Sequence, residues 1–270
     1  MKKQFKLGVI GCGFMAQSIL RGVVLSDFLH EKKIIVSDVS DERLEEVKEL
    51  GVRITDDNRF VAENSEFLLF AVKPQNFEEV AAELNGIKPE KVISVMAGVK
   101  KNVIKNSFGV SAVKVARCMP NLPCSIGSGV IGVDMFDFNR TLDDIEFISN
   151  VFNCLGTVLS VDESKMDAVT GISGSGPAYV FMFIESLIEA GVKQGLTKNE
   201  AKILAVQTVL GSAEMVERDD KSISELIMQV CSKGGTTIEA VKVLEENNLR
   251  GTISDAVGAC VKRAKELSDR

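Results

Sequence analysis

The sequence predicts an N-terminal α/β domain followed by an all-α domain. In the first half of the chain, short β-branched runs alternate with amphipathic helical stretches, as in parallel sheets joined by crossover helices. From about Thr141 onward the pattern changes to long helical periodicity. The 270 residues also exceed what one hydrophobic core usually serves. We therefore predict two domains, residues 1–160 and 161–270, with the boundary between Leu159 and Glu163.

Five β-branched runs are the candidate strands of the first domain. They are Lys6–Ile10, Ile34–Ser37, Phe67–Val72, Val92–Val95 and Val113–Arg117. One intervening helix is marked by its ends, because Ser40 precedes the segment DERLEEVKEL, acids fill its first turn and Gly51 follows it. This βαβ rhythm predicts a parallel sheet.

The second half predicts helices with broad apolar faces. The segments are DDIEFISNVFNCL, AYVFMFIESLIEAGVKQG, KNEAKILAVQTVLGSAEMVE, TIEAVKVLEE and GTISDAVGACVKRAKEL. Two of them, AYVFMFIESLIEAGV and ILAVQTVLGSA, are apolar around most of their circumference. In so small a domain this pattern predicts burial against a second copy of the chain, and hence a homo-oligomer.

Composition excludes several classes of partner. Net charge is -6, from 38 acids and 32 bases without a basic stripe, so we expect no nucleic acid partner. No stretch approaches the roughly 20 apolar residues of a membrane span, and MKKQFKLGVIGCGFM is interpreted as a first strand rather than a signal peptide. Six cysteines without a CxxC pair and the single His30 predict reduced thiols, no metal site and a cytoplasmic location.

A glycine-rich turn follows the first candidate strand and opens the helical stretch AQSILRGVVL. Gly11 permits a tight turn, Gly13 lets the backbone approach a pyrophosphate, and Ala16 permits close helix packing. An ordinary glycine turn is the alternative. The predicted cofactor contacts in this turn are Gly11, Cys12, Gly13, Phe14, Met15 and Ala16.

Asp38 lies at the end of the second candidate strand, 22 residues past Ala16. An acid at this position can accept hydrogen bonds from an adenosine ribose, which favours NADH. Ser37, Ser40 and Arg43, however, are suited to a 2′-phosphate. The cofactor is therefore predicted as NADPH or NADH, with the choice open.

Three further segments end strands at the same edge of the sheet, where open α/β sheets bind ligands. In the first of them Lys73 is expected to face the cofactor, although a solvated lysine before a turn proline is the alternative. Each of the others could be a simple turn. The candidate residues are Ala71, Val72, Lys73, Pro74, Ala97, Gly98 and Asn121.

Two segments of the helical half precede helices. Small residues around Ser175 and Gly176, before Pro177, allow the close approach of a nicotinamide ring or merely of another helix. The run from Cys231 to Thr237 offers hydroxyls and unpaired backbone N–H groups that suit a small carboxylate, with a helix-capping turn as the alternative. The chain lacks a His/Asp pair for alcohol oxidation, whereas a protonated C=N bond accepts hydride without a strong acid from the protein.

Six segments together carry a resemblance to a known family: GCGFMA, FAVKPQ, SVMAGV, RCMPNLP, MDAVTGISGSGPAYVF and SKGGTTIEAVKVLEE. In order and spacing they resemble pyrroline-5-carboxylate reductases over nearly the whole chain. The resemblance implies a Rossmann-type domain, a helical dimerisation domain that interleaves with its partner, often in larger rings, and NAD(P)H-dependent reduction of 1-pyrroline-5-carboxylate to L-proline.

The resemblance also implies roles for single residues. Thr237 is the expected proton donor or orienting group and, with Lys73, a catalytic candidate; Glu163 lies near the substrate, and Asn58 joins the cofactor contacts. The segment that binds the substrate carboxylate comprises Ser232, Gly234, Gly235, Thr236 and Thr237.

Three positions depart from the family pattern: Leu122 replaces a common threonine, Ser128 a glutamate and Lys233 a proline. Lys233 either strengthens anion attraction or loosens the turn that proline would stiffen. Two rival functions stay open. One is reduction of a different cyclic imine, since one methylene gives only ~1–3 kcal/mol of discrimination; the other is a non-catalytic nucleotide sensor.

Overall fold

The computed structural model describes residues 3–109 and 112–268. Their Cα positions form two compact units, which we call the sheet unit and the helical unit. The sheet unit runs to Ser175 and also includes the chain from Cys260 onward, and the helical unit is Gly176–Ala259. The last strand ends at Ser160, where the predicted domain limits fall; as domain limits, 1–160 and 161–270 stay a prediction.

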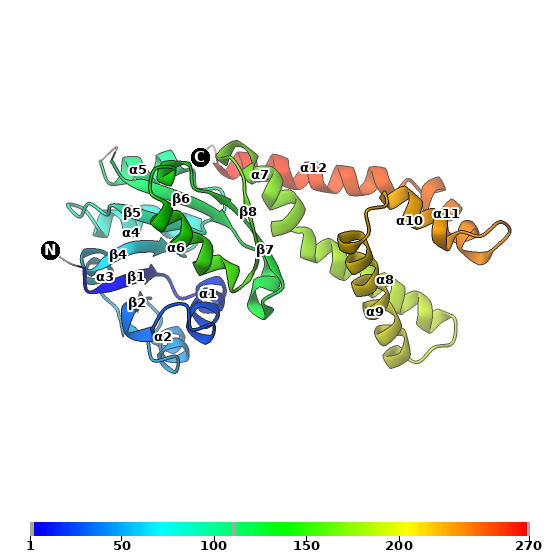
Figure 1. Ribbon diagram of the computed structural model, residues 1–270, viewed down its shortest axis with the longest axis horizontal. Coiled ribbons are helices and arrows are strands. Elements are labelled where there is room, and N and C mark those ends of the chain that lie inside the picture. The colour runs from blue at the N-terminus through cyan, green and yellow to red at the C-terminus, as the bar shows by residue number, and fades with distance from the viewer. Residues whose placement is uncertain (1–2, 110–111, 269–270) are drawn as a thin grey trace. The chain divides into compact units, whose positions relative to one another are not determined.

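One sheet organises the sheet unit (Figure 1). Its strand order is β3-β2-β1-β4-β5-β6-β7-β8, and every neighbouring pair is parallel except β6 and β7. Because the chain runs outward from β1 in both directions, the carboxyl ends of β1 and β4 form the crevice at which such sheets bind ligands. The strands are β1 (Phe5–Ile10), β2 (Ile34–Ser37), β3 (Arg53–Thr55), β4 (Ser65–Phe70), β5 (Lys91–Ser94), β6 (Lys114–Met119), β7 (Gly129–Asp134) and β8 (Gly156–Ser160).

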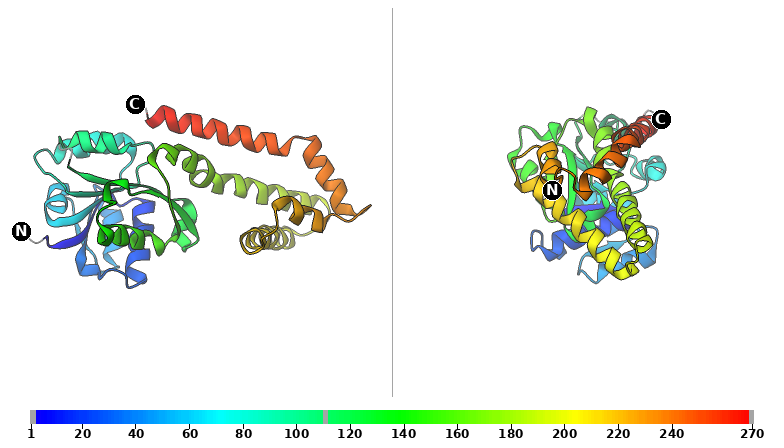
Figure 2. Two further views of the ribbon diagram at one scale, coloured as in Figure 1. Left: turned by 45° about the horizontal axis from the view of Figure 1, so that its top comes forward. Right: turned by 90° about the vertical axis from the view of Figure 1, so that its right-hand side faces the viewer.

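Helices cover both faces of this sheet (Figures 1 and 2). One apolar core joins one face of the sheet to α1, α2 and α6, through side chains such as Ile19, Leu44 and Phe152. The other core joins the opposite face to α3, α4 and α5. These helices are α1 (Phe14–Leu25), α2 (Asp41–Lys48), α3 (Asn58–Asn64), α4 (Phe77–Glu83), α5 (Lys101–Ser107) and α6 (Leu142–Asn153).

The capping signals of the sequence act as predicted. Ser40 is the N-cap of α2, and its hydroxyl accepts a hydrogen bond from the Arg43 N–H at 3.4 Å. Asp41 and Glu42 occupy the first turn of that helix, where carboxylates favour the helix dipole. Gly51 adopts a positive φ of 80° just beyond its end. The α2 prediction is therefore confirmed.

Each of the five predicted strands is present, in the predicted order, with ends shifted by one or two residues for β1, β4, β5 and β6. The expectation that helical periodicity alone continues beyond Thr141 is wrong, because β8 follows α6 and pairs with β7. Strands β3, β7 and β8 were not predicted. Strands β3 and β8 show no fully buried position, so they carry no apolar run that marks a strand in the sequence.

The helical unit is built from long helices, of which α8 packs against α9 (Figure 2). Capping boxes begin α9 at Thr197 and α10 at Ser222. No side chain of α8 is buried, and only Ala201 and Ala205 are buried in α9. Of these helices, only α10 was not predicted. The elements are α8 (Gly176–Lys193), α9 (Lys198–Arg218), α10 (Ile223–Val230), α11 (Thr236–Glu246) and α12 (Leu249–Ser268), the last of which returns to the sheet unit.

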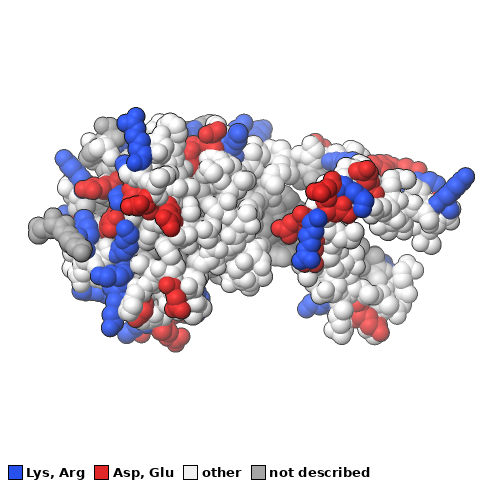
Figure 3. Space-filling view, viewed as in Figure 1, with Lys and Arg blue, Asp and Glu red and all other residues white. Residues whose placement is uncertain are grey.

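The surface and the thiols bear on the kinds of site the chain can hold. On the face drawn in Figure 3, acidic and basic side chains are intermingled. Among residues 3–109 and 112–268, no helix has the length and apolar character to cross a membrane. Nor does the described chain contain a group of three His, Cys, Asp or Glu side chains placed to hold a metal ion. All six cysteines are free thiols.

Candidate functional site: a nucleotide-binding cavity

A cavity of about 510 Å³ opens at the carboxyl ends of β1, β2 and β4. It occupies the crevice that the strand order predicts for a ligand. Eight of the predicted cofactor contacts line it. They are Gly11, Gly13, Phe14, Asp38, Asn58, Ala71, Val72 and Lys73.

Gly11 makes the sharp turn after β1. Its φ is 94°, a region that L-residues with a side chain rarely adopt. A Cβ there would lie 2.8 Å from the carbonyl carbon of Ala71 and 2.9 Å from a methyl carbon of Val72. The Gly11 N–H donates to the Ser37 carbonyl at 2.8 Å. Glycine at this position thus lets the turn lie against the ends of β2 and β4.

Gly13 serves the cavity rather than the protein's own packing. It is the N-cap of α1 with a φ of -75°, and a Cβ there would meet no atom within 4 Å. The open space on this side of the turn lies at the start of a 12-residue helix, where free N–H groups and the helix dipole attract a phosphate. The turn therefore fits the pyrophosphate of a dinucleotide.

Cys12, Met15 and Ala16 of the glycine turn face the protein interior. Cys12 and Ala16 are buried in the core, and Met15 packs against it. Burial, with the negative charges of Asp38 and Glu46, raises the pKa of the Cys12 thiol to about 12. The thiol is thus a protonated core group, and Cys12 does not line the cavity.

Asp38 is held firmly at the end of β2. Its Oδ2 accepts a hydrogen bond from the Cys12 N–H at 2.6 Å, and its Oδ1 accepts one from the Ser40 N–H at 2.9 Å. The Arg43 guanidinium lies 3.8 Å from Oδ1. The Asp38 side chain is 7% exposed and that of Arg43 is 49% exposed. The carboxylate thereby joins the glycine turn to the start of α2.

Three polar side chains at the cavity are joined in a row by hydrogen bonds. The buried Ser37 hydroxyl donates to Asn58 Oδ1 at 2.7 Å, and Asn58 Nδ2 donates to Glu83 Oε2 at 2.6 Å. Ser37 does not itself line the cavity. These bonds fix the orientation of the Asn58 amide and place the Glu83 carboxylate at the cavity.

Lys73 brings a positive charge to the same cavity. It directly precedes the short 3-10 helix η2 (Pro74–Asn76), whose first residue is the predicted contact Pro74. Lys73 is exposed, and in the part of the chain that the structure describes no carboxylate pairs with its ammonium. An exposed, uncommitted cation beside the glycine turn suits a phosphate group.

Among the predicted contacts outside the cavity lining are three that follow β5 and β6. Ala97 and Gly98 follow β5. Gly98 has a φ of 77°, and a Cβ there would lie 3.4 Å from the Cβ of Leu267 in α12. Asn121 is buried, and its Oδ1 accepts a hydrogen bond from the Val130 N–H at 3.1 Å. The structure gives Asn121 a role in joining β6 to β7. Cofactor contact by these three residues stays a prediction.

Glu163 lies in a buried ionic network. Its Oε1 accepts hydrogen bonds from the Lys101 N–H at 2.7 Å and from Arg117 at 3.4 Å, and its own N–H donates to Asp134 at 2.6 Å. Burial alone disfavours a charged Lys101, but the hydrogen bond that its ammonium donates to Asp134, together with the neighbouring acids, outweighs burial and raises the pKa of that lysine. Glu163 is therefore held in one position beside a permanent positive charge.

The small-residue segment before α8 contains a π-helical turn, Thr170–Gly174. The Ser175 N–H closes it on the Thr170 carbonyl at 2.9 Å, and the Ser175 hydroxyl lies 3.1 Å from the Cys260 sulfur. Such turns are frequent at functional sites. Gly176 begins α8, and a Cβ there would meet open space. Pro177 lies in the first turn, as predicted.

The predicted carboxylate loop forms a tight turn in the helical unit. The Gly235 N–H donates to the Ser232 carbonyl at 3.0 Å, and Gly234 has a φ of 75°. Gly235 is the N-cap of α11 and supplies no side-chain cap. Ser232 and Thr236 are exposed and Thr237 is half-buried. The loop presents hydroxyls and the uncapped start of an 11-residue helix.

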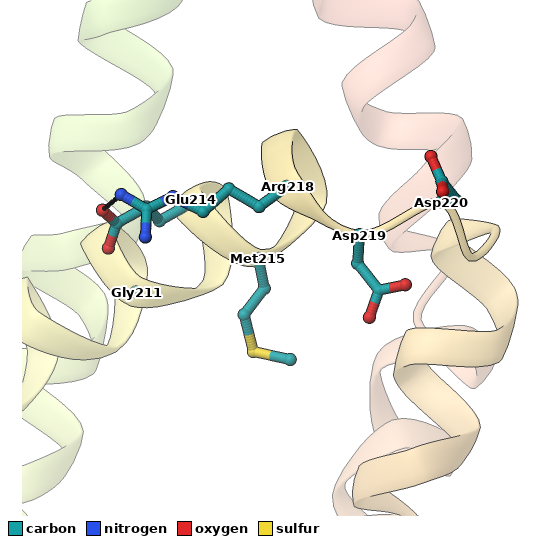
Figure 4. A pocket seen from close by; sticks show the side chains of 6 residues that line it. All are labelled: Gly211, Glu214, Met215, Arg218, Asp219 and Asp220. Carbon is teal, nitrogen blue, oxygen red and sulfur yellow. Dashed lines mark hydrogen bonds and ion pairs between the residues drawn. The ribbon is translucent and has the colours of Figure 1, made fainter.

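A separate open hollow lies at the end of α9 in the helical unit (Figure 4). Three of its four charged side chains are already paired, Arg218 with Glu214 at 2.5 Å and Asp219 with Lys221 at 3.1 Å. None of the predicted site residues lines it. The nucleotide-binding cavity of the sheet unit is thus the better candidate site.

The sequence interpretation missed several residues that line the cavity, notably Glu79 and Glu83 of α4. They are four residues apart and so lie on one face of that helix. This spacing, directly after the FAVKPQ segment, was the available signal. Val39, which is 97% exposed, and Asn76 also line the cavity.

Comparisons with known proteins place this geometry in a family. The model described as pyrroline-5-carboxylate reductase dimerisation matches residues 163–267, and that described as NADP oxidoreductase coenzyme F420-dependent matches residues 6–98. A pyrroline-5-carboxylate reductase of Synechocystis sp. is 39% identical over 269 residues, covering 98% of this chain and 99% of the relative. The chain belongs to the pyrroline-5-carboxylate reductase family. The dimerisation match indicates a homo-oligomer.

Solved structures of pyrroline-5-carboxylate reductases share the fold. The enzyme of Coxiella burnetii has a TM-score of 0.87 at 37% identity, covering 99% of each chain. That of Plasmodium falciparum, solved with NADP bound, has a TM-score of 0.88 at 30% identity and covers 99% of this chain and 100% of that chain. The predicted succession of a Rossmann-type domain and a helical dimerisation domain is therefore confirmed.

Proposed function

We propose that this chain uses NADH or NADPH to reduce 1-pyrroline-5-carboxylate to L-proline, the last step of proline biosynthesis. One observation carries the proposal: reductases of that name match the chain over its full length, at 39% identity across 98% of it. The match includes both the glycine turn and the GGTT loop.

The cavity of the sheet unit is the proposed cofactor site. Gly13 leaves room for the pyrophosphate, the start of α1 offers N–H groups, and Lys73 adds a positive charge. Bound NAD(P)H supplies the hydride that adds to the carbon of the C=N bond. The protein's contribution is to hold and orient the reactants.

The loop 232–237 is the proposed site for the substrate carboxylate. Because Gly235 supplies no side-chain cap, the first N–H groups of α11 are available to an anion. The hydroxyls of Ser232 and Thr236 are exposed beside them. Lys233, which departs from the family pattern, adds positive charge to the same turn.

Thr237 is proposed to orient the ring nitrogen and to pass it the proton that balances hydride addition at carbon. Its half-buried side chain stands in the first turn of α11, next to the carboxylate loop. Glu163, which Arg117 and the Lys101 N–H hold in place, is proposed to lie near the substrate. Each role is a proposal about this chain's own residues.

The helical unit is proposed to pair with a second copy, within a larger homo-oligomer. Large apolar side chains of α8 and α9 are exposed, among them Phe181 at 54%, Met182 at 67% and Leu204 at 55%. A second copy covering them would bury surface that single chains seldom leave in water. We place the protein in the cytoplasm, which six free thiols suit.

The test is substrate-dependent oxidation of NAD(P)H, followed by absorbance, with identification of proline in the product mixture. We expect cofactor loss and proline formation in equal amounts when 1-pyrroline-5-carboxylate is present. No substrate-dependent loss at micromolar enzyme would refute the proposal. A faster reaction with the six-membered cyclic imine would reassign the substrate.

A further inference from the structure

More acidic than basic side chains line the cofactor cavity. Three carboxylates line it, those of Asp38, Glu79 and Glu83, against the two cations of Arg43 and Lys73. NADPH differs from NADH by a phosphate at the adenosine 2′-position, which carries nearly two negative charges at neutral pH. The electrostatic free energy of binding to this cavity therefore differs between the two cofactors, because the excess negative charge repels the extra phosphate of NADPH.

Two of these carboxylates are held in fixed positions. Backbone N–H groups of Cys12 and Ser40 each occupy one oxygen of Asp38, at 2.6 and 2.9 Å. Each carboxylate oxygen has two acceptor sites, so Asp38 retains acceptor capacity for hydroxyls. Glu83 is likewise fixed by Asn58 Nδ2 at 2.6 Å. A fixed acceptor costs little ordering entropy when a hydroxyl binds it.

The structure leaves fewer groups available to a 2′-phosphate than the sequence suggests. Ser37 is fully buried, and its hydroxyl donates to Asn58. The Ser40 hydroxyl accepts from the Arg43 N–H as the cap of α2 and retains its own O–H as a donor. Arg43 lines the cavity, but its guanidinium lies 3.8 Å from Asp38 Oδ1, and the carboxylate offsets its charge.

We infer that the cavity selects NADH over NADPH, with Asp38 as an acceptor for the ribose hydroxyls and Glu83 as a second specificity-determining residue. This inference rests on the proposed nucleotide role of the cavity. Asn58 acts on the cofactor through Glu83, since its amide is engaged on both sides. Glu79, four residues before Glu83 on α4, adds to the repulsion of a phosphate.

The test is equilibrium binding of NADH and NADPH to the full-length protein by nicotinamide fluorescence, without the imine substrate. We expect NADH to bind roughly 10- to 100-fold more tightly than NADPH at low salt. Because salt screens charge repulsion, the ratio should narrow as ionic strength rises. In competition, 5′-AMP should displace NADH at lower concentration than 2′,5′-ADP.

Glu83→Gln keeps an oxygen that can accept from Asn58 and removes only the charge, so it separates electrostatics from structure. We expect it to tighten NADPH binding several-fold and thereby narrow the ratio. Glu78→Gln, on the same helix but outside the cavity lining, is the matched control and should leave the ratio unchanged. This control shows whether removing any one negative charge from α4 changes the ratio of the two affinities.

Equal or tighter binding of NADPH by the unsubstituted protein overturns the inference. So does an unchanged ratio in Glu83→Gln. Binding of neither nucleotide would overturn it together with the cofactor assignment. Tight and selective NADH binding without reduction of 1-pyrroline-5-carboxylate would support the inference while refuting the proposed function, so the two failures are distinguishable.

Discussion

At the scale of single residues, the two glycines of the first turn do different work. Gly11 is required by the protein, because its φ of 94° and the nearby Ala71 backbone leave no room for a side chain. Gly13 has an ordinary φ and open space beside it. The protein's own packing therefore does not require glycine there, whereas close approach of a pyrophosphate would require it.

This difference predicts opposite outcomes for two alanine substitutions. Gly11→Ala should lower the free energy of unfolding by about 1–3 kcal/mol through strain and overpacking, and nucleotide binding should weaken as the turn shifts. Gly13→Ala should leave thermal stability nearly unchanged but weaken NAD(P)H binding, because its methyl group enters the cavity. Thermal melts and cofactor titrations measure both. Similar melts for the two variants would contradict this account.

Thr237 allows a test of the proton step. Thr237→Ala should lower kcat about 100-fold, as expected for loss of a positioned acid or orienting group, with cofactor affinity nearly intact. Thr237→Ser retains the hydroxyl and should restore most of the rate. Steady-state kinetics and cofactor binding measure the two effects separately. Equal losses of kcat and cofactor affinity in the alanine variant would refute the assigned role.

At the scale of elements, a buried ionic network joins α5, β6 and the connection after β7. Asp137 is its centre, since it accepts from Lys105 at 2.6 Å and from the Val115 N–H at 3.0 Å. Burial alone would raise the pKa of Asp137, but these hydrogen bonds and the charge of Lys101 outweigh it and hold the pKa below 3.8. The ionised form thus stabilises the folded sheet unit.

Linkage gives the sign of the pH effect. Because folding lowers this pKa, the stabilisation is fully present above the unfolded value near 3.8 and is lost as pH falls through the lower folded value. Asp137→Asn should reduce the free energy of unfolding near neutral pH by about 1.5–3 kcal/mol. The deficit should shrink in more acidic solution, below the unfolded pKa.

Denaturant unfolding at a series of pH values measures the effect of Asp137→Asn. The exposed Asp56 gives a control, and Asp56→Asn should change little at any pH. If Asp137→Asn lowers the free energy of unfolding by the same amount at every pH, including the most acidic, the charge of the Asp137 carboxylate is not responsible for the stabilisation.

The elements also show how far the sequence could predict the fold. The βαβ units and the caps of α2 were readable because buried β-branched runs and capping residues are local signals. Strand β8, whose five residues are all partly buried or exposed, carries no such signal. The sequence could not predict Glu83 as part of the site, because an acid on a helix surface has many possible neighbours and only the fold brings it to Asn58.

At the scale of the whole molecule, the chain joins a nucleotide-binding sheet unit to a helical unit with little core of its own. Within the described residues of α8 through α11, only Ala201 and Ala205 are buried. Helices with so few buried side chains gain little from packing within one chain. We therefore expect the helical unit to depend on a partner for its stability.

Sedimentation velocity tests that dependence. The chain has a mass of 29.3 kDa, and we expect a species of at least twice that mass at micromolar concentration. Because assembly stabilises by mass action, the melting temperature should rise with protein concentration. A well-folded monomer whose melting temperature is independent of concentration would contradict the proposed pairing.

Hydride transfer to the imine carbon is the central claim, and isotope transfer tests it most directly. The enzyme is given 1-pyrroline-5-carboxylate with NADH or NADPH deuterated at the transferable C4 position, and the proline product is examined by mass spectrometry and NMR. We expect one deuterium, at C5 of proline, in every product molecule. Proline without deuterium, or no proline at all, would contradict the account.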